Sequence, residues 1–171
     1  MPSRLKRYHT FGHDHFITFS CHQRLPLLNN DHARIIFEET LEKLRVRHRF
    51  YVFGYVLMPE HVHLLISEPK THPLATTLSV LKRETSKFLR RNRAQFWQTR
   101  YYDFNTFTQP KFTEKLRYIH RNPVERGLAT NPEDWLWSSY RHWLTGEPGR
   151  VEIESHWTFN RRERSTASLP E

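Results

Sequence analysis

Four stretches of the chain combine apolar residues with many β-branched and aromatic side chains, a pattern that favours β-strands. Three of them are residues 15–21, 50–58 and 61–67, and the fourth, which is largely aromatic, is residues 96–107. Only two residues separate the second stretch from the third. So short a break predicts a hairpin or a tight bend between two strands.

Three other stretches place apolar residues at roughly helical spacing. The first begins at Asp31, a residue type that favours helix N-caps, and runs to about His48. The second spans residues 73–92 and the third about residues 111–121. The apolar stripe of the second helix would consist of Leu74, Leu78, Leu81 and Phe88. The order β-α-β-β-α-β predicts an α+β fold of the ferredoxin-like split β-α-β type, an antiparallel sheet with helices on one face, plus a C-terminal extension.

The two ends of the chain differ from this middle part in composition. Residues 1–13 are basic and polar and are expected to form an arm. The sequence then predicts one domain over residues 1–145, with the arm included. A charged C-terminal tail, residues 146–171, is expected to follow and to fray.

The charge of the chain points to a polyanionic partner. The 171 residues carry a formal net charge of +9 at pH 7 with neutral histidines. Such an excess favours nucleic acid first and an anionic membrane surface second. Aromatic residues make up 14% of the chain, and they can fill a core or stack on bases. A basic ribosomal-type protein is the plainer alternative, although such proteins rarely carry so many Trp and His.

Cys21 is the only cysteine, which excludes an internal disulfide and a cysteine-based zinc site. Its apolar neighbours make a strand residue a better interpretation than a nucleophile. A reducing cytoplasm is the simplest setting for such a chain. No apolar run approaches the length of a transmembrane helix, and the first residues lack the apolar stretch of a signal peptide. We therefore expect a cytoplasmic protein without a membrane partner.

Two histidines in the predicted third strand offer a candidate metal site. Side chains two residues apart in a strand lie on the same face, so His61 and His63 point one way and Val62 points into the core. Without cysteine ligands, a site completed by oxygen or nitrogen ligands and water suits Mg²⁺ or Mn²⁺ better than structural zinc. A bare His-x-His pair is common, so a structural role stays open. The neighbouring Glu60 is predicted to be a turn residue outside the site.

Tyr118 is the candidate nucleophile. A tyrosine can attack a phosphodiester when a metal ion activates the phosphate. Asn122 follows four positions later on the predicted helix, so one helix face could present a nucleophile and a polar metal ligand together. Pro123 disfavours helical geometry at Asn122, which could instead cap a new helical turn. Judged by residue type alone, a tyrosine such as Tyr118 is more often an ordinary core or surface residue than a nucleophile.

Four segments follow one another at suitable separations: MPEHVHLLI, FWQTRYYD, LRYIHRNPVERGL and a W-x-W-S-S-Y stretch. Together they resemble the REP-associated tyrosine transposases. These are relatives of the small insertion-sequence transposases of the single-tyrosine HUH class, in which two His flank a hydrophobic residue. The resemblance covers about residues 8–143. The HUH element alone is moderately specific, whereas its pairing with the YIHRNPVERGL segment is strongly specific.

The resemblance implies a metal-dependent single-stranded DNA endonuclease and strand transferase. His61 and His63 would correspond to the HUH metal ligands, and Asn122 falls where related transposases place a third ligand for Mg²⁺ or Mn²⁺. Tyr118 would attack a DNA phosphate near a folded hairpin, such as a repetitive extragenic palindrome (REP). The attack would form a 5′-phosphotyrosine link and release a 3′-hydroxyl. Glu60 departs from the family pattern, in which Asn is expected more often before the first His.

Two groups of basic residues could contact DNA phosphates, although a solvated surface is the alternative. They are Arg4, Lys6 and Arg7 on the arm and Lys82, Arg83, Lys87, Arg90 and Arg91 on the second helix. Trp97, Tyr101 and Tyr102 could stack on bases, but at least half of them are expected in the core.

Two other functions remain as alternatives at this point. One is a catalytically inactive relative that only binds hairpin nucleic acid, and the other is a basic, RNA-associated structural protein. The oligomeric state is equally open. Related insertion-sequence transposases act as dimers that can exchange tyrosine helices, whereas the extra C-terminal segment of this chain could cap a monomer.

Overall fold

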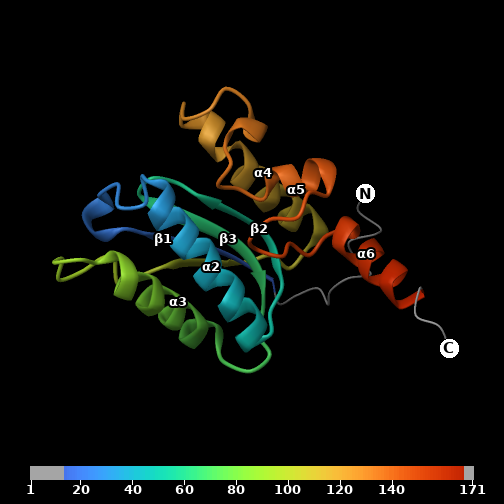
Figure 1. Cartoon of the computed structure of the whole chain (residues 1–171), viewed down its shortest axis with the longest axis horizontal. Coiled ribbons are helices and arrows are strands. Elements are labelled where there is room, and N and C mark those ends of the chain that lie inside the picture. Colours follow the sequence, from blue (N-terminus) through green and yellow to red (C-terminus); the bar gives the residue numbers. More distant parts are fainter. Residues whose placement is uncertain (1–13, 168–171) are drawn as a thin grey trace.

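The computed structural model describes residues 14–167, in which four antiparallel strands form one sheet (Figure 1). The strands are β1 (Asp14–Ser20), β2 (Val52–Leu57), β3 (His61–Ser67) and β4 (Tyr102–Asn105). The helices are α2 (Asp31–His48), α3 (Leu74–Leu89), α4 (Gln109–Glu125), α5 (Tyr140–Thr145) and α6 (His156–Ala167). Two short 3-10 turns, η1 (His22–Arg24) and η2 (Pro132–Asp134), complete the set.

The sheet has the strand order β2-β3-β1-β4. With α2 between β1 and β2, and α3 between β3 and β4, this is the predicted ferredoxin-like arrangement. The expected placement of helices on one face is confirmed for α2 and α3, which pack side by side (Figure 1). Helix α4 lies on the opposite face, where its buried Phe112 meets Phe53 of β2 at a ring-centroid distance of 5.1 Å. The sheet therefore carries helices on both faces.

Alternation along β3 separates two hydrophobic cores. Val62, Leu64 and Ile66 belong to the core under α2 and α3. Leu65 belongs to the second core, under α4. His61 and His63 share the parity of Leu65, so both histidines face α4, away from the larger core.

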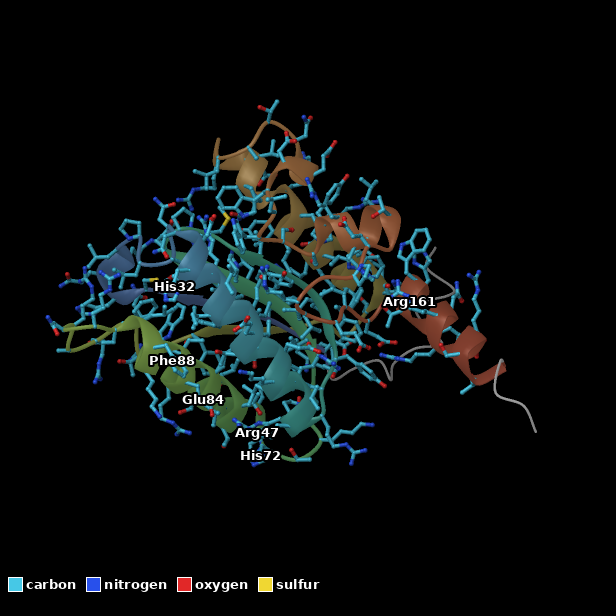
Figure 2. The ribbon with its side chains drawn as sticks, viewed as in Figure 1. His32, Arg47, His72, Glu84, Phe88 and Arg161 are labelled. Carbon is cyan, nitrogen blue, oxygen red and sulfur yellow. The ribbon has the colours of Figure 1, made fainter. Side chains whose placement is uncertain are left out.

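The helices differ from the sequence predictions in a cap, an apolar stripe and their bounds. Asn30, and not Asp31, caps α2, because its side chain accepts a hydrogen bond from the Ala33 amide at 2.8 Å. In α3 the apolar stripe ends with Leu89, which packs against the core. Phe88 projects outward and is 63% exposed (Figure 2). Helix α4 starts earlier and ends later than predicted.

Among residues 14–167, none of the helices combines the length and the hydropathy that a membrane span requires.

The predicted strand over residues 96–107 is wrong for its first half. Only β4 at its end pairs with β1, whereas Trp97 touches the sheet through an isolated bridge to Cys21. Trp97 is buried, and its indole N–H donates to the Lys82 carbonyl and the Thr85 hydroxyl, both at 3.1 Å. Burial of the indole ring, with its N–H satisfied by α3, fixes this segment and prevents a longer strand.

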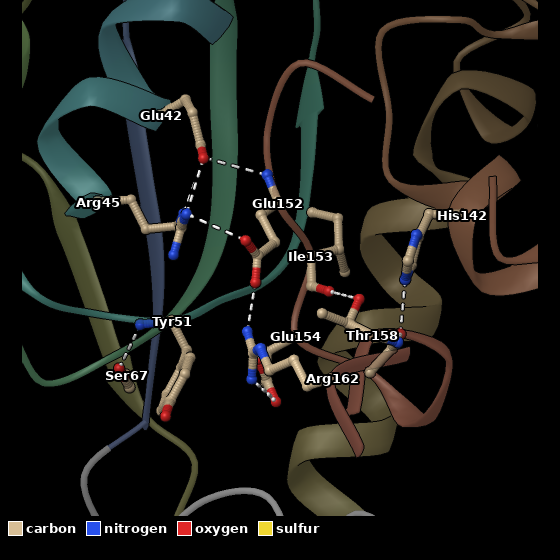
Figure 3. A network of polar contacts seen from close by, with 11 residues as sticks. Glu42, Arg45, Tyr51, Ser67, His142, Glu152, Ile153, Glu154, Thr158 and Arg162 are labelled. Carbon is tan, nitrogen blue, oxygen red and sulfur yellow. Dashed lines mark hydrogen bonds and ion pairs between the residues drawn. The ribbon is translucent and has the colours of Figure 1, made fainter. Parts of the chain in front are cut away.

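Residues 146–167 fold onto the domain and end in α6, which corrects the prediction of a frayed tail for this part of the chain. Val151 and Ile153 are buried, and Ile153 forms a parallel bridge with Val52 of β2. The charged residues that suggested a solvated tail instead form a network. It connects α2, residues 152–154 and α6 (Figure 3). Its ion pairs connect Arg45 to Glu42 and Glu152, and Arg162 to Glu152 and Glu154.

Candidate active site

The sheet and α4 bring the predicted site residues together in one cleft of about 600 Å³. His61, His63, Tyr118 and Asn122 all line this cleft. The rings of His61 and His63 have centroids 4.6 Å apart, and the ring of Tyr118 lies 5.2 Å from that of His63. Tyr118 is 42% exposed, so its hydroxyl-bearing ring is open to the cleft.

A glycine in β2 sets the approach of α4 to the sheet. A Cβ atom added at Gly54 would lie 2.5 Å from Cδ1 of Leu116 on α4 and 3.3 Å from the Ser139 hydroxyl. A side chain there would push Leu116 aside, so the absence of a Cβ lets the helix lie directly on the strand. Ile119, one residue after the candidate nucleophile, is fully buried in this contact. The packing thereby fixes which face of α4 turns toward the histidines.

Each histidine has its Nδ1 atom held by a neighbour and its Nε2 atom turned toward the other ring. His61 Nδ1 lies 2.9 Å from a carboxylate oxygen of Glu60, and His63 Nδ1 lies 2.7 Å from the Thr18 hydroxyl. The two Nε2 atoms are 3.0 Å apart. A carboxylate only accepts, so neutral His61 carries its hydrogen on Nδ1 and presents a lone pair at Nε2.

The second imidazole can also present a free lone pair. With His61 Nε2 as the acceptor, the two contacts are satisfied when His63 Nε2 donates to it and the Thr18 hydroxyl donates to His63 Nδ1. A hydroxyl can accept as well as donate, so His63 can move its hydrogen to Nδ1 and keep its bond to Thr18. Outer partners of this kind orient metal-binding histidines in proteins.

Burial keeps both imidazoles neutral. For His61, burial lowers the pKa and outweighs the adjacent Glu60 carboxylate, which raises it. For His63, burial is the main cause, and the protonated form of His61 and the Lys115 ammonium contribute less; together they lower the pKa to about 3. Neutral imidazole is the form that binds metal ions, so the pair is ready to act as ligands near pH 7.

Asn122 supplies a third polar atom in the same cleft. It lies inside the continuous helix α4, so the alternative in which it caps a new turn before Pro123 is wrong. Its side chain is only 4% exposed, and its Oδ1 atom has no hydrogen-bond partner among the described residues. Buried amide oxygens are nearly always bonded, so an unpaired one beside two histidines is the expected sign of a ligand position.

The residues present fit a divalent cation with mixed nitrogen and oxygen ligands. Within residues 14–167, no group of three or more His, Cys, Asp or Glu side chains could hold a metal ion. A complete site therefore depends on the Asn122 amide joining the two imidazoles. One oxygen and two nitrogen donors, with room in the cleft for water and a phosphate, suit Mg²⁺ or Mn²⁺.

Glu60 belongs to the site, contrary to the sequence prediction. Its carboxylate pairs with His61, with Arg126 at 2.8 Å and with Arg24 at 3.4 Å. Burial alone would raise the pKa of Glu60, but its neighbours His61 and Arg126 lower it by more than burial raises it, so the carboxylate stays ionised. The carboxylate thus orients one imidazole and holds two guanidinium groups at the rim of the cleft.

Sequence analysis missed the cationic lining of the cleft. Arg24, Lys115 and Arg126 line it together with a single unpredicted acid, Glu125. Lys115 precedes Tyr118 by three positions on the same helix face, a spacing that could have identified it. Positive charge around the tyrosine and the histidines favours a phosphate in this position.

The basic residues predicted on α3 do not reach this cleft. Arg83, Lys87, Arg90 and Arg91 are exposed, but α3 covers the other face of the sheet. Lys82 is not a free surface cation, because its ammonium donates to the carbonyls of Gln98 at 2.5 Å and Thr99 at 3.3 Å. The other three predicted contacts, Arg4, Lys6 and Arg7, lie outside the described residues.

The remaining candidates divide between core and surface. Trp97 is buried, Tyr101 is half-buried against the larger core, and Tyr102 is exposed in the cleft. Cys21 is fully buried, and burial raises the pKa of its thiol to about 12, which agrees with a structural residue. His120 turns away from the cleft and bonds to the Ser139 hydroxyl at 2.8 Å.

Comparisons with known proteins match most of this chain. A family model for IS200-like transposases matches residues 10–122. Among solved structures, a REP-associated tyrosine transposase bound to a REP hairpin is similar with a TM-score of 0.68 and 20% identity. The match covers 87% of this chain and 90% of that one, which shows a shared fold. A proposed transposase from Deinococcus radiodurans R1 is similar with a TM-score of 0.49 and 15% identity, over 65% of this chain and 91% of that one. No curated protein matches the chain.

Proposed function

Because the chain belongs to the family of IS200-like transposases, we propose that it is a metal-dependent single-stranded DNA endonuclease and strand transferase. The observation that carries this proposal is the meeting of Tyr118 with His61, His63 and the Asn122 amide oxygen, which has no partner in the described part of the chain, in one cationic cleft. Two of these groups come from β3 and two from successive turns of α4. Their convergence supports a common reaction centre better than four separate structural roles.

Tyr118 is the proposed nucleophile. Its phenolic oxygen forms a bond to the phosphorus of a DNA phosphodiester, and the bond from phosphorus to the 3′-oxygen breaks. The phenol gives up its proton to solvent, and the departing 3′-oxygen takes one up as a 3′-hydroxyl. The product is a 5′-phosphotyrosine link, and attack by another 3′-hydroxyl reverses the step and joins two strands. No oxidant or nucleotide cofactor is consumed.

His61, His63 and Asn122 are the proposed ligands for Mg²⁺ or Mn²⁺, which when bound would polarise the scissile phosphate and stabilise its developing charge. Glu60 and Thr18 keep the two imidazoles in position through their Nδ1 atoms. Lys115 and the guanidinium groups of Arg24 and Arg126 attract the DNA backbone to the cleft. The low pKa of His63 keeps this residue available as a ligand at neutral pH.

The proposed substrate is single-stranded DNA beside a folded hairpin of the REP type. The similar solved transposase, which was bound to a REP hairpin, supports this choice. The exposed residues Arg83, Lys87, Arg90 and Arg91 remain candidates for phosphate contacts outside the cleft. Their position on α3 or just after its end supports contact with a part of the DNA away from the scissile phosphate, such as the paired stem.

A covalent-adduct assay tests the proposed reaction. Protein incubated with labelled hairpin DNA that has unpaired flanks is expected to give, with Mn²⁺, a protein–DNA adduct that survives denaturation. Tyr118→Phe is expected to abolish the adduct and to leave DNA binding intact. Tyr140→Phe, a half-buried tyrosine outside the cleft, is the matched control and is expected to retain it.

Other outcomes of this assay would contradict parts of the proposal. An adduct that persists in Tyr118→Phe would assign the nucleophile to another tyrosine. An adduct that forms equally in excess chelator would remove the metal ion from the reaction. Tight, salt-sensitive binding without cleavage at any Mn²⁺ concentration would instead indicate a protein that only binds hairpin nucleic acid.

A further inference from the structure

The strand register places one exposed aromatic residue beside the histidine pair. Thr18 of β1 lies opposite His63 of β3 and also opposite Tyr102 of β4. Residues directly opposite one another in antiparallel strands have side chains on the same face, so these three form a row across the cleft floor. With strands about 4.8 Å apart, the backbone of Tyr102 lies about 10 Å from that of His63.

Tyr102 is 53% exposed and lines the same cleft as Tyr118. Its ring packs against buried Phe16 in a T-shaped arrangement, with a centroid distance of 6.4 Å and an interplanar angle of 73°. Phe16 in turn stacks on His63 at 5.3 Å and meets Tyr118 edge-on at 5.9 Å. One buried phenylalanine thus supports the metal-site histidine, the candidate nucleophile and Tyr102.

We propose that Tyr102 is a stacking platform for an unpaired nucleobase next to the scissile phosphate. An exposed aromatic face on the floor of a cationic cleft is the arrangement that proteins use to bind single strands, because every base offers a face for stacking. A base within a duplex is covered on both sides by its neighbours and cannot use this surface. The proposal rests on the proposed function and specifies its substrate as a strand whose bases are unpaired at the cleavage site.

Lys115 is placed to bind the backbone of the same nucleotide. Its ammonium lies 4.9 Å from the ring centroid of Phe16 and 4.8 Å from that of Phe104. Phe104 is two residues after Tyr102 on β4 and lies opposite Phe16, so both share the face of Tyr102. A phosphate at Lys115 and a base on Tyr102 are therefore compatible with one nucleotide.

Binding measured without metal tests the platform separately from cleavage. The probes are an oligothymidylate of about 16 nucleotides, within the usual site size for single strands, and a strand of equal length made only of abasic sites. Tyr102→Ala is expected to weaken oligothymidylate binding by about 5- to 150-fold, the range for loss of one stacked base. The same substitution is expected to leave the affinity for the abasic strand unchanged.

Two further variants identify the cause of the loss. Tyr102→Phe keeps the aromatic face and is expected to bind oligothymidylate like the unmodified chain. Phe107→Ala removes a ring that is 67% exposed outside the cleft and is the matched control, with no expected change. A Tyr102→Ala variant that weakens both probes equally, or neither, would overturn the platform. So would a Tyr102→Phe variant that binds as poorly as Tyr102→Ala.

Different results would exclude the stacking platform and the proposed cleavage reaction. Adduct formation by the unmodified chain, together with no base-dependent loss in Tyr102→Ala, would remove the platform alone. A base-dependent loss without any adduct would keep the platform and remove the reaction. Binding is measured in chelator, so cleavage cannot affect it.

Discussion

Replacing Asn122 by Leu is expected to stabilise the metal-free protein and to abolish its response to Mn²⁺. The Asn122 side chain is 4% exposed, and its Oδ1 atom has no hydrogen bond among the described residues. A buried polar atom without a partner destabilises a fold by about 1–3 kcal/mol. Leu has a similar size, carries no polar atom that needs a hydrogen bond and is the better helix former, so it removes this cost within α4.

The free energy of unfolding is therefore expected to rise by about 1–3 kcal/mol in chelator. For a chain of this size, each kcal/mol corresponds to a Tm increase of about 2–4 °C. The measurement is equilibrium unfolding in urea, with and without Mn²⁺. A ligand that binds only the folded state stabilises it, so the unmodified chain is expected to gain stability from Mn²⁺ and Asn122→Leu is not.

Asn105→Leu is the matched control. Among residues 14–167 the Oδ1 atom of Asn105 also finds no hydrogen-bond partner and is buried, but this residue lies outside the cleft. Its variant is expected to respond to Mn²⁺ like the unmodified chain. A role for Asn122 as a metal ligand would be refuted if Asn122→Leu were less stable in chelator than the unmodified chain, or if Mn²⁺ stabilised both equally. Either result would mean that the Asn122 amide is a structural group and not a ligand.

Three more predictions concern the surroundings of the site. Glu60→Ala removes the acceptor of His61 and is expected to raise the Mn²⁺ concentration needed for half-maximal adduct formation about 10- to 100-fold; an unchanged Mn²⁺ titration would exclude this orienting role. A mixture of the Tyr118→Phe variant and the His63→Ala variant is expected to stay inactive, because α4 packs on the sheet of its own chain. Restored cleavage would instead demonstrate exchange of α4 between chains. Burial raises the pKa of the Cys21 thiol to about 12, so thiolate is scarce at pH 8. Iodoacetamide is therefore expected to modify this residue only after unfolding. Rapid labelling of the folded chain would contradict the burial of Cys21.

Local patterns predicted the parts of the site that lie close together in the sequence. The two-residue period of β3 places His61 and His63 on one face, and the four-residue spacing on α4 places Tyr118 beside Asn122. The family suggested by four short segments is confirmed at the level of IS200-like transposases. These features depend on backbone geometry within single elements, which the sequence specifies directly.

Contacts between distant segments escaped prediction. Glu60 looked like a turn residue because its partner Arg126 is 66 positions away, beyond the reach of any local pattern. The effect of Pro123 was misjudged for the opposite reason, because a local preference was given too much weight. Helix α4 continues through Pro123, which is buried, so tertiary packing overrides the preference of the preceding residue for an extended backbone.

The outer edge of β2 is covered by other segments of the chain, which has a consequence for solubility. Val52 forms a β-bridge with Ile153, and Val56 forms one with Ser138. The Leu57 amide donates to the Trp137 carbonyl at 2.8 Å. Backbone groups that could recruit a strand from another molecule are thus occupied within the chain. Residues 137–138 and 153 therefore protect an otherwise open sheet edge. A chain shortened before Trp137 would keep the paired strands of the sheet but would expose this edge and be prone to edge-to-edge aggregation.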